Sequence, residues 1–165
     1  VIFTPWLHGN RCPFEDPNAA GMFFNIRLDT GKTELIRSVV EGICFHMRWM
    51  LERQEQKISK YKKSSAVRFC GGGALGETTC QILADVLQRD VVVVESPQNI
   101  GAVGAAACIA VGMQLIPTIE DVKKLIPVKT TYHPNSENKA VYDKNFKVFQ
   151  NLYKCNKENF AILNS

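Results

Sequence analysis

The strongest constraint on the fold is a glycine run that follows a β-like segment and precedes a helix-like one. Residues Gly71 to Gly76 read Gly-Gly-Gly-Ala-Leu-Gly and contain the spacing G-x-G-x-x-G. A short strand is expected at 66–70, a helix at 78–87 and a strand buried on both faces at 91–94. The succession of strand, glycine run, helix and strand is typical of a nucleotide-binding α/β layer.

Glycine suits such a junction because it has no Cβ atom, so the backbone can approach a ligand closely and can adopt positive φ. We therefore expect ligand contact at the run and positive φ within it. A tight turn that needs glycine only for packing is the alternative without a ligand. A Walker A loop is excluded because no Gly-Lys-Ser/Thr sequence occurs in the chain.

A dinucleotide site is one interpretation of the glycine spacing. Glu95 stands 19 residues after Gly76 at the end of a predicted strand, where the acid that binds a ribose belongs. Two features are not typical of that site: three glycines are consecutive, and the helix starts late, after Gly76. The spacing alone leaves the choice of nucleotide open.

The rest of the chain predicts one α/β layer domain with at least partly parallel strands. We expect a loop and a short strand at 22–26 within residues 1–32, an α/β core at 33–115, and C-terminal helices at 116–165. Helices are predicted at 33–56, 100–111, 118–126 and 142–160, with a turn at 132–135. The buried face of the first helix should carry Ile36, Val40, Ile43, Met47 and Met50. The alanines and glycines of 100–111 should allow close packing.

Composition excludes several classes of protein. The net charge is only +4, and the densest basic run, 57–63, holds a single aromatic residue, so we expect a solvated loop and no nucleic-acid partner. No stretch approaches 18 apolar residues and the first residues do not resemble a signal peptide, so no membrane partner is expected. The six cysteines show no C-x-x-C spacing, and three lie in apolar helical runs, which favours a reduced cytoplasmic protein. Those three are Cys44, Cys80 and Cys108.

The segments around the glycine run resemble, in order, the C-terminal signature of the FGGY carbohydrate kinases of the actin/Hsp70/sugar-kinase superfamily. The matching stretches are GGGALGE at 71–77, QILAD at 81–85, VVVV at 91–94 and GAA at 104–106. Upstream, TPWLHGN at 4–10 resembles the Pro-Trp-Leu-x-Gly loop of that family, and 35–48 resembles its arginine-to-Glu-Gly helix. The tail from residue 132 is similar to that of the xylulokinase branch.

The resemblance implies an RNase-H-like, actin-like ATPase domain at the C-terminus of a sugar kinase, lacking its first strands. ATP and Mg²⁺ are the implied cofactors, and a small sugar, D-xylulose first, is the implied acceptor. By position, the adenosine side of the cleft would be formed by Gly72, Gly73, Ala74, Leu75 and Glu77. No catalytic or metal-binding residue is expected in this chain, and the metal would be held through ATP and the N-terminal kinase domain. Uncovered sheet edges predict either a homodimer or dependence on that domain.

Three departures from the family pattern keep other functions open. Asn10 and Ala20 stand where the family commonly has glutamate and arginine, and Glu77 stands where a small polar residue or asparagine is frequent. Glu77 either accepts hydrogen bonds from a ribose or only favours the dipole of its helix. A non-catalytic, kinase-derived module and an NAD-binding segment of a dehydrogenase are therefore the two alternative functions.

Overall fold

The computed structural model describes residues 1–58 and 64–165, and these residues form two compact units. Unit 1 contains the N-terminal segment through α1, the last turn of α2 (85–87) and residues 135–165. Unit 2 contains residues 64–84 and 88–134. Most of the basic run 57–63, predicted as a loop, lies outside the described residues. The mixed α/β architecture agrees with the predicted fold class.

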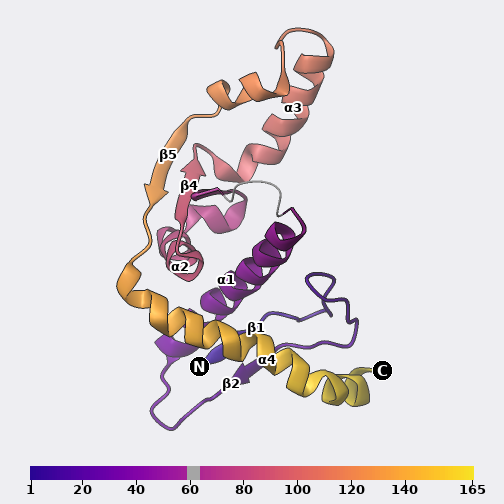
Figure 1. The fold of residues 1–165 in the computed structure, drawn as a ribbon, viewed down its shortest axis with the longest axis vertical. Coiled ribbons are helices and arrows are strands. Elements are labelled where there is room, and N and C mark those ends of the chain that lie inside the picture. Colours follow the sequence, from indigo (N-terminus) through magenta and orange to yellow (C-terminus); the bar gives the residue numbers. More distant parts are fainter. Residues whose placement is uncertain (59–63) are drawn as a thin grey trace. The chain divides into compact units, whose positions relative to one another are not determined.

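Unit 1 is built from a two-stranded antiparallel ribbon and two long helices (Figure 1). β1 (Ile2–Thr4) pairs with β2 (Met22–Phe24), with Phe3 opposite Phe23. Helices α1 (Lys32–Lys57) and α4 (Lys139–Asn164) both pack against β1. β1 lies in a stretch predicted as loop, and its three residues are too few for an alternating pattern to be recognised in the sequence.

The core of unit 1 is aromatic and depends on one close backbone approach. Trp6, Phe45 and Phe149 are almost completely buried. The rings of Trp6 and Phe45 both pack against Phe149, with centroid distances of 5.5 and 5.7 Å. A Cβ atom added to Gly42 would stand 2.2 Å from the Phe3 carbonyl oxygen. Only glycine therefore lets α1 lie this close to β1.

The buried face of α1 differs from the predicted one. The helix buries Ser38, Gly42, Phe45 and Trp49, whereas the predicted Ile36 and Ile43 are 58% and 39% exposed. The predicted stripe follows the aliphatic residues, of which Val40, Met47 and Met50 are half-buried, but Gly42 lets β1 approach a neighbouring face of the helix. Close approach of the backbone, which hydropathy does not register, decides which face is buried.

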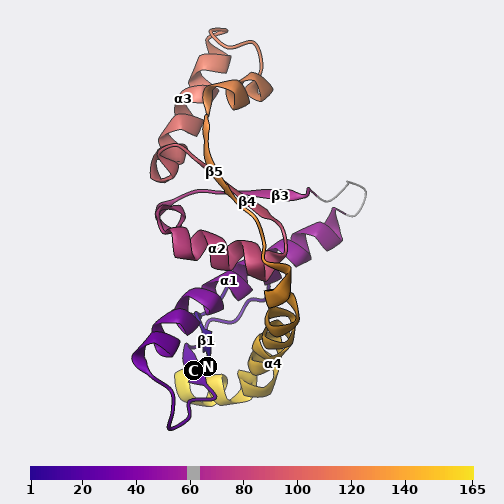
Figure 2. The same cartoon turned by 90° about the vertical axis from the view of Figure 1, so that its left-hand side faces the viewer.

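Unit 2 is a three-stranded sheet in the order β3–β4–β5 (Figure 2). β3 (Ala66–Phe69) and β4 (Asp90–Val94) are parallel, joined through the 3₁₀ turn η1 (Gly72–Leu75) and helix α2 (Glu77–Leu87). After β4 come η2 (Pro97–Asn99), α3 (Ile100–Gly112) and η3 (Ile119–Leu125). β5 (Val128–Tyr132) then returns antiparallel to β4.

Two expectations for unit 2 need correction, whereas the helix predicted at 118–126 is present as the 3₁₀ helix η3. Residues 128–132 form a strand inside the region predicted to hold C-terminal helices, and Tyr132 ends that strand instead of starting a turn. The expected close packing of α3 is absent among the described residues: only Ala107 is buried, Cys108 is exposed, and a Cβ atom at Gly101 or Gly104 would meet nothing within 4 Å.

All six cysteines are free, with Cys44 and Cys80 buried and the other four exposed. Within residues 1–58 and 64–165, no helix combines the length and the apolar character needed to cross a bilayer. In the same residues, no group of three or more histidine, cysteine or acidic side chains is placed to hold a metal ion.

Candidate nucleotide-binding site

The glycine run is held in place by backbone hydrogen bonds within unit 2. Gly71 has φ of 90°, the left-handed conformation that favours glycine, and its N–H donates to the Pro97 carbonyl oxygen at 2.8 Å. The bond fastens the start of η1 to η2, and the two turns pack together. The expected positive φ therefore occurs at Gly71, before the residues predicted to contact the ligand, and not at Gly73.

The five predicted site residues do not all present their side chains in the same way. Gly72, Gly73, Leu75 and Glu77 are exposed, whereas Ala74 is only 6% exposed and packs inward. The carbonyl oxygen of Ala74 lies 3.6 Å from the Cys80 sulfur, inside the unit. Ala74 can thus contribute its backbone and its packing to a ligand surface, but not its methyl group.

Gly72 and Gly73 differ in the space around them. A Cβ atom at Gly72 would meet no atom within 4 Å, while one at Gly73 would stand 3.1 Å from the Phe69 ring. The side of Gly72 therefore faces open space that a planar, mostly apolar ligand can approach along the backbone. Gly73 instead lies over the ring of Phe69, the last residue of β3.

The first three glycines of the run are separated from α2 by the end of the turn η1, and only Gly76 adjoins the helix. Gly76 is the residue that caps α2, no side chain caps it, and the first acidic residue of the helix is Glu77. In a dinucleotide site the glycine-rich loop leads directly into the helix, so that the pyrophosphate meets its N-terminus. Here η1 takes up most of the run, and the carboxylate of Glu77 occupies the place where the helix dipole would favour an anion.

Tyr132 belongs beside this surface, although the sequence reasoning placed it in a turn. Partial burial raises the pKa of its phenol, with smaller contributions from Cys80 and Glu77. The Gln81 side-chain amide donates to the His133 carbonyl oxygen at 2.9 Å and holds the end of β5 against α2. The signal for this strand was available: β-branched and aromatic residues lie at 128–132 between Pro127 and Pro134.

Each aspartate that could be considered as a catalytic base has a structural partner. Asp85 is 5% exposed and accepts from the Asn135 N–H and the Asn138 amide, both at 2.8 Å. Asp16 is buried and accepts from the Tyr153 hydroxyl at 3.0 Å. The remaining three bind neighbouring groups: Asp29 pairs with Arg27, Asp90 with His133, and Asp121 with Lys124 and Thr118.

The loop that departs from the family pattern is well ordered in unit 1. Asn10 and Asp16 exchange two backbone hydrogen bonds of 2.8 and 2.9 Å, and the Asn10 amide donates to the Phe14 carbonyl oxygen at 2.8 Å. Asn10 thus stabilises its own loop, a role that glutamate, which has no amide donor, does not reproduce. The Ala20 carbonyl oxygen accepts from Thr4, which is fully buried.

Comparison with known proteins identifies the family. Residues 1–113 match the family model described as the FGGY family of carbohydrate kinases, C-terminal domain. The chain therefore belongs to the FGGY family of carbohydrate kinases, and the fold is that of its C-terminal, actin-like ATPase domain.

Individual relatives agree with this assignment. The chain is 28% identical to a xylulose kinase of Staphylococcus epidermidis over 99% of its own length and 32% of that enzyme. It is 32% identical to a glycerol kinase of Allorhizobium ampelinum over 55% of its length and 18% of the relative. Among solved structures, xylulose kinase and gluconate kinase from Lactobacillus acidophilus superpose with TM-scores of 0.87 and 0.86, each 25% identical and matched over 98% of this chain and 32% of theirs.

The chain thus spans about a third of the length of the relatives it matches. Membership in a carbohydrate kinase family removes the support for an NAD-binding segment.

Proposed function

We propose that this chain forms the adenosine side of the nucleotide site in an ATP-dependent sugar kinase. The observation that carries the proposal is the exposed, side-chain-free surface at Gly72 in a chain of the FGGY family. Adenine is planar and mostly apolar, so a backbone without Cβ atoms suits its face. Phosphate binding by this loop is not required.

Each residue of the predicted site then has a separate role. Gly72 and Gly73 form the wall against which the base lies, Leu75 adds an exposed apolar side chain, and Ala74 anchors the turn. Glu77 is placed to accept hydrogen bonds from ribose hydroxyls. Tyr132 ends β5, which Gln81 of α2 holds through the next residue, His133, and it is the additional residue that we assign to the edge of this site.

For the reaction, we propose transfer of the ATP γ-phosphate to a hydroxyl of a small sugar, with D-xylulose as the first candidate. Xylulose kinases are prominent among the relatives, and a gluconokinase and a glycerol kinase also match, so the acceptor belongs to the polyhydroxylated small molecules. Phosphoryl transfer also needs Mg²⁺, phosphate-gripping loops and a general base. The aspartates considered as a catalytic base have structural partners, so we assign these parts to an N-terminal kinase domain like that of the longer relatives. The six free cysteines support a cytoplasmic enzyme.

The first prediction tests the nucleotide. Titration calorimetry of residues 1–165 should show that ADP binds more tightly than NAD, because the proposed surface contacts only the adenosine and the nicotinamide half of NAD has no assigned partner. We expect weak ADP binding, since the phosphate contacts are assigned elsewhere. If ADP and NAD bound with equal affinity, both to residues 1–165 and to the protein as it is expressed naturally, the assignment of an adenosine site would be refuted.

A non-catalytic module is the second candidate, because Asn10, Ala20 and Glu77 depart from the family pattern. Nucleotide binding would then persist without turnover. An ADP-release assay of the natural protein with xylulose, ribulose, glycerol and gluconate separates the two: turnover with any acceptor supports the kinase, and silence with all four supports the module.

A further inference from the structure

A second hollow lies in unit 1 between the C-terminal half of α1 and the middle of α4. It has a volume of about 330 Å³ and is lined by Trp49, Glu52, Arg53, Gln56, Gln150 and Lys154. Trp49 is almost fully buried and forms its floor. The hollow is large enough for a small ligand, because such sites begin at roughly 300 Å³.

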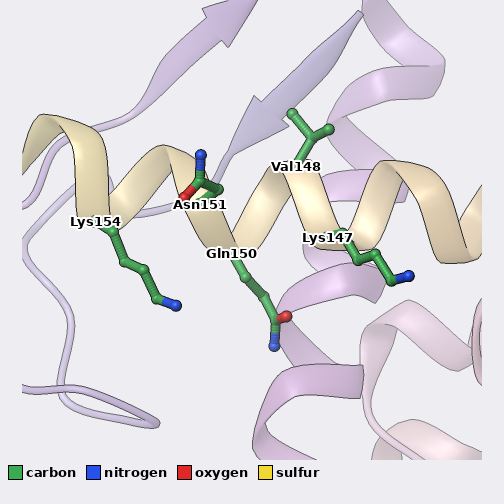
Figure 3. A pocket seen from close by; sticks show the side chains of 5 residues that line it. All are labelled: Lys147, Val148, Gln150, Asn151 and Lys154. Carbon is green, nitrogen blue, oxygen red and sulfur yellow. The ribbon is translucent and has the colours of Figure 1, made fainter.

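The neighbouring surface of α4 extends this hollow. Gln150 and Lys154 also belong to a shallow, open surface of α4 that includes Lys147, Val148 and Asn151. Figure 3 shows Lys147, Gln150 and Lys154 extending to one side of α4, and Val148 and Asn151 to the other. Lys147 and Lys154 are two helical turns apart, about 10 Å along the axis. We call the surface formed by Arg53, Gln56, Lys147, Gln150 and Lys154 the α1–α4 groove.

The charge of the groove is positive and is not balanced by its own acid. Glu52 is engaged by Arg48, whose Nε lies 2.9 Å from a Glu52 oxygen. Among the ion pairs of the described residues, none includes Arg53, Lys147 or Lys154, and Arg53 makes only a long 3.4 Å bond to Gln56. Glu158, one turn beyond Lys154 on α4, makes no ion pair with it in these residues.

The donors in the groove match the chemistry of a phosphate group. A guanidinium presents a planar fork that binds phosphate through two hydrogen bonds, and a lysine adds a point charge. The amides of Gln56 and Gln150 add neutral donors beside them. Cations that line a concave surface also reinforce one another's potential, which an exposed, convex helix face does not achieve.

We propose that the α1–α4 groove binds a phosphate-bearing small molecule between Arg53 and Lys154, with Lys147 strengthening the field. The residues of this site belong to unit 1, whereas the glycine surface assigned to adenosine belongs to unit 2. The two sites therefore share no residue, and the groove supplies a second ligand site beyond the proposed kinase reaction.

The test uses inorganic pyrophosphate as the probe and amide chemical shifts of residues 1–165 as the readout, at constant ionic strength. We expect saturable shifts confined to 49–56 and 147–154. Arg53→Gln and Lys154→Gln should each raise the dissociation constant at least five-fold. Lys32→Gln is the matched control, because it removes the same charge from α1 roughly 30 Å away along the helix and should change the constant less than two-fold.

Four outcomes would overturn the proposal, of which the last concerns succinate. The first is the absence of saturable binding in the unchanged chain. The second is equal weakening by Lys32→Gln, which would mean that only net charge matters. The third is loss of the shifts in Gly72→Ala, which would place the probe at the adenosine surface. Succinate should bind at least five-fold more weakly than pyrophosphate, and equal binding would contradict a phosphate site. These binding measurements do not depend on kinase activity, so their results would be the same if the proposed kinase function were wrong.

Discussion

Gly72 offers the cleanest single-residue test of the adenosine surface. A Cβ atom there meets nothing within 4 Å, so Gly72→Ala should leave the fold unchanged. If the base lies against this backbone, the added methyl group should raise the ADP dissociation constant roughly ten-fold, since misplacing a bound group costs of the order of 1–2 kcal/mol. Calorimetry of the variant and of the unchanged chain measures the difference.

Gly101→Ala is the matched control, because a Cβ atom at that position in α3 also meets nothing within 4 Å. Gly73→Val probes the same surface less cleanly, since the new side chain must displace the Phe69 ring from 3.1 Å. Unchanged ADP affinity in both Gly72→Ala and a folded Gly73→Val would show that the run is only a turn.

Asp85 illustrates how a residue inside a family motif can be structural. Asp85 lies in the QILAD stretch and is not expected to be catalytic. Its two carboxylate oxygens accept hydrogen bonds from the Asn135 N–H and from the Asn138 side-chain amide. Asp85→Ala should lower the free energy of unfolding by about 2–3 kcal/mol, because hydrogen bonds to a buried charged group are lost. Urea unfolding measures this change.

Asp29→Ala is the comparison for Asp85. Asp29 pairs with Arg27 at 3.6 Å on an exposed loop, so its loss should have almost no effect on the free energy of unfolding. A loss at Asp85 no larger than that at Asp29 would contradict the anchoring role.

At the scale of elements, α1 and α4 are joined through Arg48. Its guanidinium donates to Asp143 at 2.8 Å and to the Val86 carbonyl oxygen at 3.1 Å, and lies 4.3 Å from the centre of the Phe146 ring. Lys139 and then Arg48 lower the pKa of the Asp143 carboxyl. One arginine therefore links α1 to the last turn of α2 and to α4.

This link predicts a stability that depends on pH. Because the pKa of Asp143 is lower in the folded chain, the ion pair stabilises the fold above the unfolded pKa of about 4, and this contribution is lost as the pH falls through the folded pKa. Arg48→Met should cost about 1–3 kcal/mol at neutral pH and clearly less near pH 2. Urea unfolding at both pH values, with Lys144→Met as an exposed control, measures the effect, and a cost independent of pH would exclude Asp143 as its source.

Element positions were predicted more successfully than element faces. The helices at 32–57, 77–87, 100–112 and 139–164 and the strands β3 and β4 were recognised because each carries a clear hydrophobic period or a β-branched run. The predicted buried face of α1 was wrong because Gly42, which contributes little hydropathy, allows the close approach to β1. β5 was missed although its β-branched and aromatic residues lie between two prolines, because the segment was included in a region expected to be helical.

The candidate site shows the same division. Its location at the glycine run followed from the sequence, since glycine has a direct conformational meaning at a strand–helix junction. The inward orientation of Ala74, the positive φ at Gly71 and the proximity of Tyr132 depend on how η1, η2 and β5 pack, and no spacing in the sequence encodes these contacts.

At the scale of the whole molecule, the proposed function gives residues 1–165 only one wall of a nucleotide site. Phosphoryl transfer requires donor, metal, base and acceptor in one geometry, and that arrangement contributes several kcal/mol, about 7–11 in favourable cases. Residues 1–165 should therefore show no sugar-dependent ADP release with D-xylulose, ribulose, glycerol or gluconate. Turnover by this chain would mean that one of the aspartates assigned to structural partners is the base.

The thiol of Cys70, immediately before the glycine run, can be used to detect ligand binding by chemical modification. Cys70 is exposed and adjoins Gly71, whereas Cys80, eleven residues from the end of β3, is buried. Trypsin cleaves after Arg68, so both thiols fall in one peptide, and only the first should alkylate readily in the native state. A nucleotide bound against Gly72 would shield the Cys70 thiol from the alkylating reagent. The alkylation rate of that peptide would then report the occupancy of the nucleotide site without any engineered label.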